Sequence, residues 1–203
     1  MKPYVIELKP LIHHAINVLG MDALIGKSTA GRKYGKKVKE ITASLPSDAG
    51  FYLWGFYTSV GLWRSVYLGK AGYGVSTSLR SRIDEELRDE RPFAWCEHQM
   101  NTDHIWQKWK NPDNIPGHEP SPKARQHFDR SIRKAGSTHV IAVSLPVSEI
   151  DNKSISSIEA DLIETLNPIA NVQRPRPHSS LQDKTIEVIR VFKDSIHSHR
   201  PAR

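Results

Sequence analysis

Two aromatic runs with strong β-propensity lie close together in this 203-residue chain, and they constrain its fold more than any other feature. Residues 51–57 form the first run and residues 62–68 the second, with a short break that contains Gly61 between them. Aromatic residues favour strands, and two such runs around a short glycine-containing break are typical of a β-hairpin. We therefore expect an antiparallel sheet built on this hairpin.

Further segments complete an α+β pattern around the hairpin. Residues 139–145 are largely apolar and end at a proline, which predicts a third strand. An apolar stripe over residues 154–166 predicts a helix that ends before Pro168, because the residue before a proline disfavours the helical conformation. Residues 181–196 show the same periodicity, and another helix is expected to begin after one of the hydroxyl residues at 76–78.

The N-terminal part of the chain has a different composition. Residues 4–21 carry apolar side chains at helical spacing, which predicts an amphipathic helix. Residues 26–39 contain six basic residues, three glycines and one tyrosine, which predicts a flexible basic arm or loop. Such an arm would bind a phosphate backbone, although a solvated loop has the same composition. The candidate DNA-contacting residues are Arg32, Lys33, Lys36 and Lys37.

One domain with short additions is expected for a chain of this length. We assign residues 1–47 to the N-terminal helix and basic arm, residues 48–176 to the main domain and residues 177–203 to a C-terminal helical tail. Within the main domain, residues 91–136 are rich in proline, tryptophan and histidine. We interpret that stretch as an insertion.

The charge balance favours a polyanionic partner. The chain carries 29 lysine and arginine residues against 22 aspartate and glutamate residues, a formal net charge of +7. Cys96 is the only cysteine, which excludes an intrachain disulfide and favours a reducing compartment. No apolar run reaches about 18 residues, the length that spans a membrane. We therefore expect a cytoplasmic protein without membrane contact.

Two charged residues lie inside the apolar stripes of expected helices. Glu159 lies within the stripe of residues 154–166, and Arg82 lies beside Ile83. A charge turned towards a core is costly unless it is paired, hydrogen-bonded or bound to a cation. Glu159 is therefore a candidate metal ligand, whereas a salt bridge to Glu86, one turn away, is the structural alternative for Arg82.

The order of the motifs resembles that of the GIY-YIG nuclease family. Its two namesake triplets correspond to Gly50-Phe51-Tyr52 and Tyr67-Leu68-Gly69. The resemblance spans residues 48–173 and continues through Lys70-Ala71, Leu79, Arg82, Glu159, Leu162-Ile163, Asn167-Pro168 and Asn171. It implies a GIY-YIG fold, with a three-stranded antiparallel sheet flanked by helices and the active site on the sheet surface.

The resemblance also implies roles for the matched charged and amide residues. Glu159 would hold a single divalent ion, Mg²⁺ or Mn²⁺, that acts as a Lewis acid on the scissile phosphate. Arg82 would bind a phosphate oxygen and offset the charge that develops in the transition state. Asn171 would brace the site rather than take part in the chemistry.

Two tyrosines are candidates for handling the attacking water. The resemblance implies that Tyr52 or Tyr67 positions or deprotonates it. A free tyrosine has a pKa of about 10, so the chosen residue needs help, and Lys70 is the nearest cation in the sequence. Ordinary strand packing is the alternative explanation for both tyrosines.

One position departs from the family pattern. Members often carry histidine or tyrosine four residues after the arginine, and in this chain that position is Glu86. A carboxylate there could be a second metal ligand, a partner that orients Arg82, or a sign of altered activity.

These features together predict a divalent-metal-dependent endonuclease that hydrolyses DNA phosphodiester bonds. A compact catalytic region with its own insertion resembles the restriction-type members most, which act on short duplex sites, often as homodimers. The alternatives are a structure-selective repair or recombination nuclease, a mobile-element nuclease and an RNA-directed nuclease. A non-catalytic nucleic-acid-binding module that kept the fold is the alternative from a different class.

Overall fold

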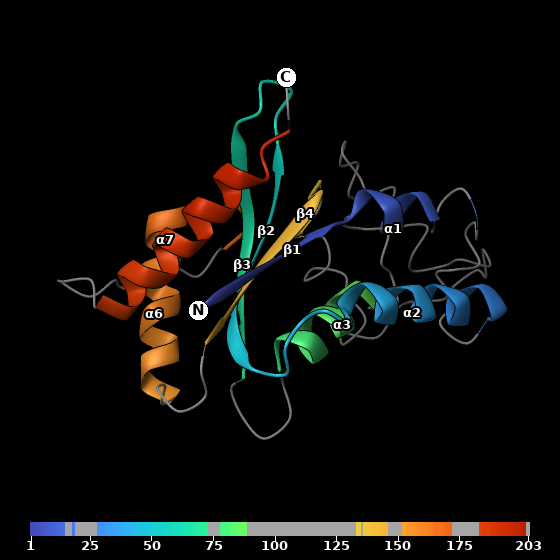
Figure 1. Ribbon diagram of the computed structural model, residues 1–203, viewed down its shortest axis with the longest axis horizontal. Helices are drawn as coiled ribbons and strands as arrows, with labels where there is room; N and C mark the ends of the chain where they lie inside the picture. The colour runs from blue at the N-terminus through green and yellow to red at the C-terminus, as the bar shows by residue number, and fades with distance from the viewer. Residues whose placement is uncertain are drawn as a thin grey trace, which may run out of the picture.

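A computed structural model describes residues 1–14, 18, 28–72, 78–88, 133–134, 136–145, 152–171 and 183–201. These residues form a four-stranded sheet and five helices, numbered as in Figure 1. The strands are β1 (Lys2–Glu7), β2 (Ala49–Tyr57), β3 (Trp63–Ala71) and β4 (His139–Leu145). The helices are α1 (Lys9–His13), α2 (Thr29–Thr42), α3 (Leu79–Arg88), α6 (Asn152–Leu166) and α7 (Asp183–Ser198).

The sheet is antiparallel throughout, with the strand order β1-β4-β2-β3. The predicted hairpin is confirmed as the pair β2–β3, in which Tyr52 lies opposite Gly69 and Trp54 lies opposite Tyr67. A bulge between Trp54 and Gly55 shifts the register towards the tip of the hairpin. Strand β3 is the edge strand on this side of the sheet.

The prediction of a three-stranded sheet is wrong by one strand. Residues 2–7, which include the start of the helix expected at 4–21, form β1 and pair with β4. Strand β4 is buried along its whole length, and without β1 it would carry an open edge of unpaired backbone groups. This pairing outweighs the weak helical pattern of the segment, and helix begins only at α1, with Pro10 in its first turn.

The basic segment at residues 26–39, predicted as a flexible arm or loop, is helical in its described part. Helix α2 begins after Ser28, whose Oγ accepts a hydrogen bond of 2.8 Å from the backbone N–H of Gly31. The Tyr34 hydroxyl donates to the Leu87 carbonyl oxygen in α3 at 2.8 Å and holds the two helices together. The prediction failed because the buried stripe is narrow. That stripe consists of Gly31, Tyr34, Val38 and Thr42.

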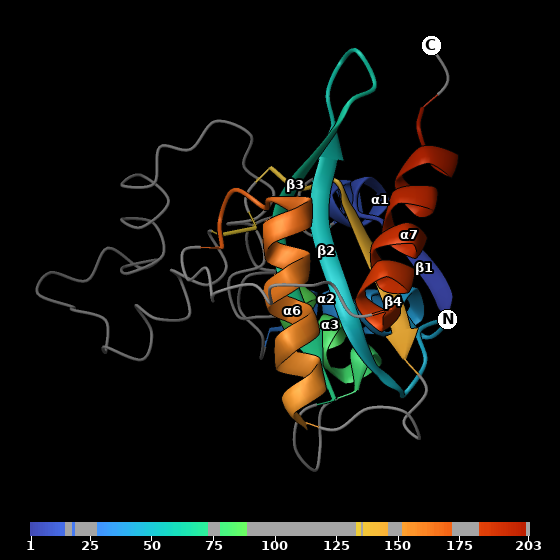
Figure 2. The same cartoon turned by 90° about the vertical axis from the view of Figure 1, so that its left-hand side faces the viewer.

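The sheet separates two groups of helices, as Figures 1 and 2 show. Helices α1, α2 and α3 cover one face, called here the α3 face, and α6 and α7 cover the other, called the α6 face. Side chains alternate along β2, so Tyr52 and Trp54 point to the α3 face and Phe51 and Leu53 to the α6 face. The α+β class is confirmed, and so are the predicted segments that correspond to α3, β4, α6 and α7.

The insertion predicted at residues 91–136 lies almost entirely outside the described residues, together with Cys96. Of it, only residues 133–134 and 136 belong to the described part of the chain. None of the described helices is long and apolar enough to cross a membrane.

Candidate active site

Helix α3 presents its charged side chains through an ordinary amphipathic pattern. Leu79, Ile83 and Leu87 are fully buried against the sheet, at four-residue spacing. Arg82 and Glu86 follow one edge of this stripe and are themselves four residues apart, so they are neighbours on the helix surface. The helix therefore carries both groups towards β2.

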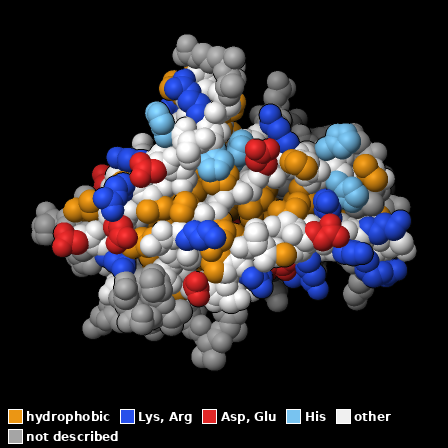
Figure 3. All heavy atoms as spheres, viewed as in Figure 1, with side chains coloured by type: hydrophobic (Ala, Val, Ile, Leu, Met, Phe, Trp, Pro, Cys, Tyr) orange, Lys and Arg blue, Asp and Glu red, His pale blue; other side chains and the backbone are white. Residues whose placement is uncertain are grey.

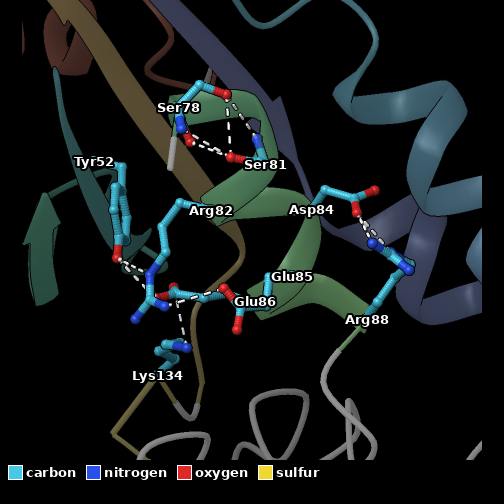
Figure 4. Close-up of polar contacts among 9 residues, drawn as sticks. All are labelled: Tyr52, Ser78, Ser81, Arg82, Asp84, Glu85, Glu86, Arg88 and Lys134. Carbon is cyan, nitrogen blue, oxygen red and sulfur yellow. Dashed lines mark hydrogen bonds and ion pairs between the residues drawn. The ribbon is translucent and has the colours of Figure 1, made fainter. Parts of the chain in front are cut away.

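Tyr52, Arg82 and Glu86 meet on the α3 face of the sheet, as Figure 4 shows. The Tyr52 hydroxyl donates a hydrogen bond of 2.7 Å to Oε1 of Glu86. The Arg82 Nε atom lies 3.1 Å from the same oxygen and 3.3 Å from the Tyr52 hydroxyl oxygen. The salt bridge considered as the alternative for Arg82 is therefore present. It joins Arg82 to a nearly buried carboxylate.

Lys134 is a member of this cluster that the sequence analysis missed. It lies in a turn before β4, in which Gly136 has a φ of 76° and the Ser137 N–H donates to the Lys134 carbonyl oxygen. Its ammonium is 3.0 Å from Oε2 of Glu86, and both side chains are only 5% exposed. It also faces the rings of Trp54 and Tyr67, 5.4 and 5.8 Å from their centroids. No local pattern in the sequence links Lys134 to Glu86.

The glycine of the second triplet makes room for the Tyr52 ring. A Cβ atom built on Gly69 would lie 2.3 Å from the Tyr52 hydroxyl oxygen and from the ring carbon that bears it. Tyr52 is 1% exposed, and its hydroxyl is held by Glu86, so the ring cannot easily move aside. The cross-strand pair Tyr52–Gly69 therefore fixes where the hydroxyl lies.

Glu159 and Lys70 form a second charged group, on the α6 face. The Lys70 ammonium lies 2.7 Å from Oε2 of Glu159 and donates a hydrogen bond of 3.1 Å to Oγ of Ser156. The side chains of Lys70 and Glu159 are 26% and 22% exposed, so solvent and ligands can still reach both. Helix α6 thus brings the predicted carboxylate to the predicted lysine.

Tyr67 lies on β3 near both charged groups. Alternation along the strand directs Tyr67 to the α3 face and Lys70 to the α6 face, three residues further on. Burial raises the pKa of Tyr67 to about 12, helped by the carboxylates of Glu86 and Glu159 and opposed by Arg82 and Arg133. Tyr67 therefore lies within electrostatic reach of both charged groups.

Tyr52 is held as a hydrogen-bond donor. Burial, followed by the nearby charge of Glu86, raises the pKa of Tyr52 well above its usual value, against the opposing effect of Arg82. Burial disfavours the charged form of Arg82, but the Tyr52 and Glu86 oxygens outweigh this effect and raise its pKa. The contact between these three residues therefore contains a neutral phenol and a charged guanidinium.

Asn171 braces the edge strand β3. Its Oδ1 accepts from the Leu68 N–H at 2.8 Å, and its Nδ2 donates to the Leu68 carbonyl oxygen at 3.0 Å. The residues just before it continue this pairing, since the N–H groups of Ile169 and Ala170 donate to carbonyl oxygens of β3. Residues 169–171 therefore replace a strand along part of the outer edge.

The carboxylate of Glu159 can hold a magnesium ion only if solvent and substrate supply the other ligands of the ion. The described residues contain no group of three or more histidine, cysteine, aspartate or glutamate side chains that could hold a metal ion. Mg²⁺ commonly takes one or two carboxylates and fills its other positions with water and phosphate oxygens. The partly exposed carboxylate of Glu159 meets this requirement, although Lys70 shares one of its oxygens.

The predicted DNA-contacting residues lie on α2, apart from both charged groups. Arg32, Lys33 and Lys36 are exposed, and Lys37 makes an exposed ion pair of 3.4 Å with Glu40. In the space-filling view, lysine and arginine side chains gather at the end of the molecule where α2 lies (Figure 3). Because α2 packs against α3, this basic surface adjoins the helix that carries Arg82.

Comparison of the chain with protein-family models, with curated proteins and with solved structures gave no match.

Replacing Asn171 by alanine is expected to lower the free energy of unfolding by about 1–2 kcal/mol, because the Leu68 N–H and carbonyl oxygen lose their partners. Urea denaturation measures the loss, and the Leu68 amide should exchange its hydrogen faster. Ile169→Ala in the same segment is the control, since that side chain is 72% exposed. Equal stability of the two variants would contradict the bracing role.

Proposed function

We propose that this protein is a divalent-metal-dependent endonuclease that hydrolyses phosphodiester bonds in DNA. The observation that supports it most is that Tyr67 on β3 lies within electrostatic reach of both charged groups. Arg82 and Tyr67 come from the α3 face, and Glu159 with Lys70 comes from the α6 face. The motif order that resembles the GIY-YIG family requires this same set of residues.

Arg82 is suited to offset charge on a phosphate. Its Nε is engaged by Glu86 and its Nη1 lies 3.1 Å from the exposed carboxylate of Glu85, while the described residues offer no partner to Nη2. A guanidinium binds phosphate oxygens through its planar edge, and a fixed cation at that place stabilises the charge that develops as the bond breaks. The side chain of Glu85 is 63% exposed, so a phosphate could replace it at Arg82.

Tyr67 is the better candidate for the attacking water. The Tyr52 hydroxyl donates a hydrogen bond to Glu86 and the residue is 1% exposed, so this hydroxyl is already engaged and shielded from solvent. A pKa of about 12 keeps Tyr67 protonated in the free protein, so its hydroxyl oxygen would orient the water. Tyr67 could take a proton from the water only as the phenolate, a form that a nearby bound cation would favour by lowering that pKa.

Glu159 would hold Mg²⁺ or Mn²⁺, and Lys70 would keep its carboxylate in place. When bound, such an ion supplies Lewis-acid polarisation of the phosphate. The contact of 2.7 Å to Lys70 and the hydrogen bond from Lys70 to Ser156 fix the direction of the carboxylate before any ion arrives. In this arrangement the role of Lys70 is to orient the carboxylate of Glu159 rather than to lower the pKa of a tyrosine.

Duplex DNA is the proposed substrate because of the basic surface on α2. A formal net charge of +7 and the exposed side chains Arg32, Lys33 and Lys36 favour a phosphate backbone. A restriction-type enzyme that acts as a homodimer is the form proposed, since two strands require two active sites or two visits. A repair, recombination or mobile-element nuclease would use the same residues on another substrate.

A non-catalytic nucleic-acid-binding module is the second candidate. It is favoured by the pairing of both key charges within the protein, since Glu159 pairs with Lys70 and Arg82 pairs with Glu86. This candidate predicts binding to DNA without metal-dependent cleavage.

Glu159→Gln is expected to abolish cleavage of plasmid DNA in the presence of Mg²⁺, because the amide cannot replace the carboxylate as a metal ligand. Glu164→Gln, on the exposed side of the same helix, is the matched control and should cut like the wild type. Gel analysis of plasmid, branched DNA and RNA, each with Mg²⁺ or EDTA, measures the outcome. Failure of the wild-type protein to cut any of these substrates would refute the nuclease proposal and favour the binding module.

Lys33→Gln with Lys36→Gln is expected to weaken duplex binding and to reduce the salt slope of log K by up to about 2, because two phosphate contacts are lost. Arg190→Gln with Lys193→Gln removes two exposed charges from α7, on the opposite side of the sheet, and should change binding far less. Fluorescence anisotropy over a range of salt concentrations measures both slopes. If the two double variants behaved alike, α2 would have no special role in binding.

A further inference from the structure

Glu86 is the centre of the hydrogen-bonded and ionic contacts on the α3 face. One oxygen, Oε1, accepts from the Tyr52 hydroxyl at 2.7 Å and lies 3.1 Å from Arg82 Nε. The other oxygen, Oε2, lies 3.0 Å from the ammonium of Lys134. These partners come from β2, from α3 and from the turn before β4, so three separate parts of the chain converge on one carboxylate (Figure 4).

This arrangement is costly as a way to stabilise the fold. The side chains of Glu86 and Lys134 are each 5% exposed, so both charges have lost almost all contact with water. A buried ion pair of this kind often contributes no more stability than apolar side chains of similar volume. The rings of Trp54 and Tyr67 lie against the ammonium. Another role therefore deserves a test.

The geometry determines how Arg82 is oriented. Among the described residues, Glu86 and the Tyr52 hydroxyl both engage Nε, which is one edge of the guanidinium, and the exposed Glu85 contacts Nη1. A guanidinium recognises a phosphate through its plane and edge, so its direction matters as much as its charge. Lys134 holds the second oxygen of Glu86, which prevents the carboxylate from turning away from Arg82.

We propose that Glu86 and Lys134 are positioning residues that direct the guanidinium of Arg82 towards the substrate phosphate. The inference rests on the proposed nuclease function, and it assigns a task to a buried lysine that no sequence motif marks. Neither residue touches the substrate. Both act through Arg82.

Two double variants test this role. Both remove the charges of Glu86 and Lys134, and they differ only in whether position 86 keeps a side-chain oxygen that can accept a hydrogen bond from Arg82. Glu86→Met with Lys134→Met replaces the ion pair by unbranched apolar side chains, which is expected to preserve the fold. Glu86→Gln with Lys134→Met keeps an amide oxygen that can still accept from Arg82 Nε. A thermal unfolding curve of each variant shows whether it is folded before its activity is compared.

The expected result is a split between kcat and KM. The Glu86→Met, Lys134→Met protein should lower kcat by about 10- to 100-fold with little change in KM for DNA. In this variant the guanidinium of Arg82 keeps its charge but is no longer held in a fixed orientation. The glutamine variant should recover part of this loss at equal stability. If the methionine pair cut as fast as the wild type, Glu86 and Lys134 would be ordinary core residues and the inference would be overturned.

A second readout does not depend on cleavage. The Nε–H group of Arg82 gives its own nitrogen–hydrogen NMR signal, and its exchange with solvent is slow when the group is hydrogen-bonded. We expect slow exchange in the wild type and exchange at least about tenfold faster in the Glu86→Met, Lys134→Met protein, because the carboxylate acceptor is lost and only the longer contact to the Tyr52 hydroxyl is left. Fast exchange in the wild type would overturn the positioning role even if the protein cuts DNA. If the wild-type protein shows slow exchange but cuts no substrate, the orientation of Arg82 by Glu86 is supported and only the nuclease function is refuted.

Discussion

The antiparallel pairing of β2 with β3 is the constraint on which the rest of the site depends. It sets Tyr52 opposite Gly69, and only glycine leaves room there for the tyrosine ring. The same register directs Tyr67 to the α3 face and Lys70 to the α6 face, because side chains alternate along a strand. Strand β3 is the outermost strand on this side, with residues 169–171 paired along part of its outer edge.

The charges around β3 are arranged in two self-paired groups. Glu86 neutralises part of the charge of Arg82 and Lys134 in a buried setting, whereas Glu159 and Lys70 remain partly exposed. The difference in exposure matches two different tasks. A buried pair is suited to holding a direction, and a partly exposed pair is suited to receiving a ligand.

The sequence predicted what local patterns determine. The hairpin, α3, β4, α6 and α7 follow from periodicity and turn residues, and the Arg82–Glu86 contact follows from their spacing on a helix. It failed at residues 2–7, where pairing with a distant strand decides the structure, and at residues 26–39, where a narrow buried stripe is hidden among lysines. Lys134 was beyond prediction, because only tertiary folding brings it to Glu86.

Line broadening by Mn²⁺ tests the central claim most directly, namely that residues from both faces of the sheet form one metal-dependent site at the edge of β3. In the NMR spectrum of the wild-type protein, substoichiometric Mn²⁺ should broaden the amide signals of Glu159 and of Tyr67 to Lys70 together. The same addition to the Glu159→Gln protein should leave those signals sharp. Broadening that persists in the variant, or that centres elsewhere on the molecule, would contradict the account.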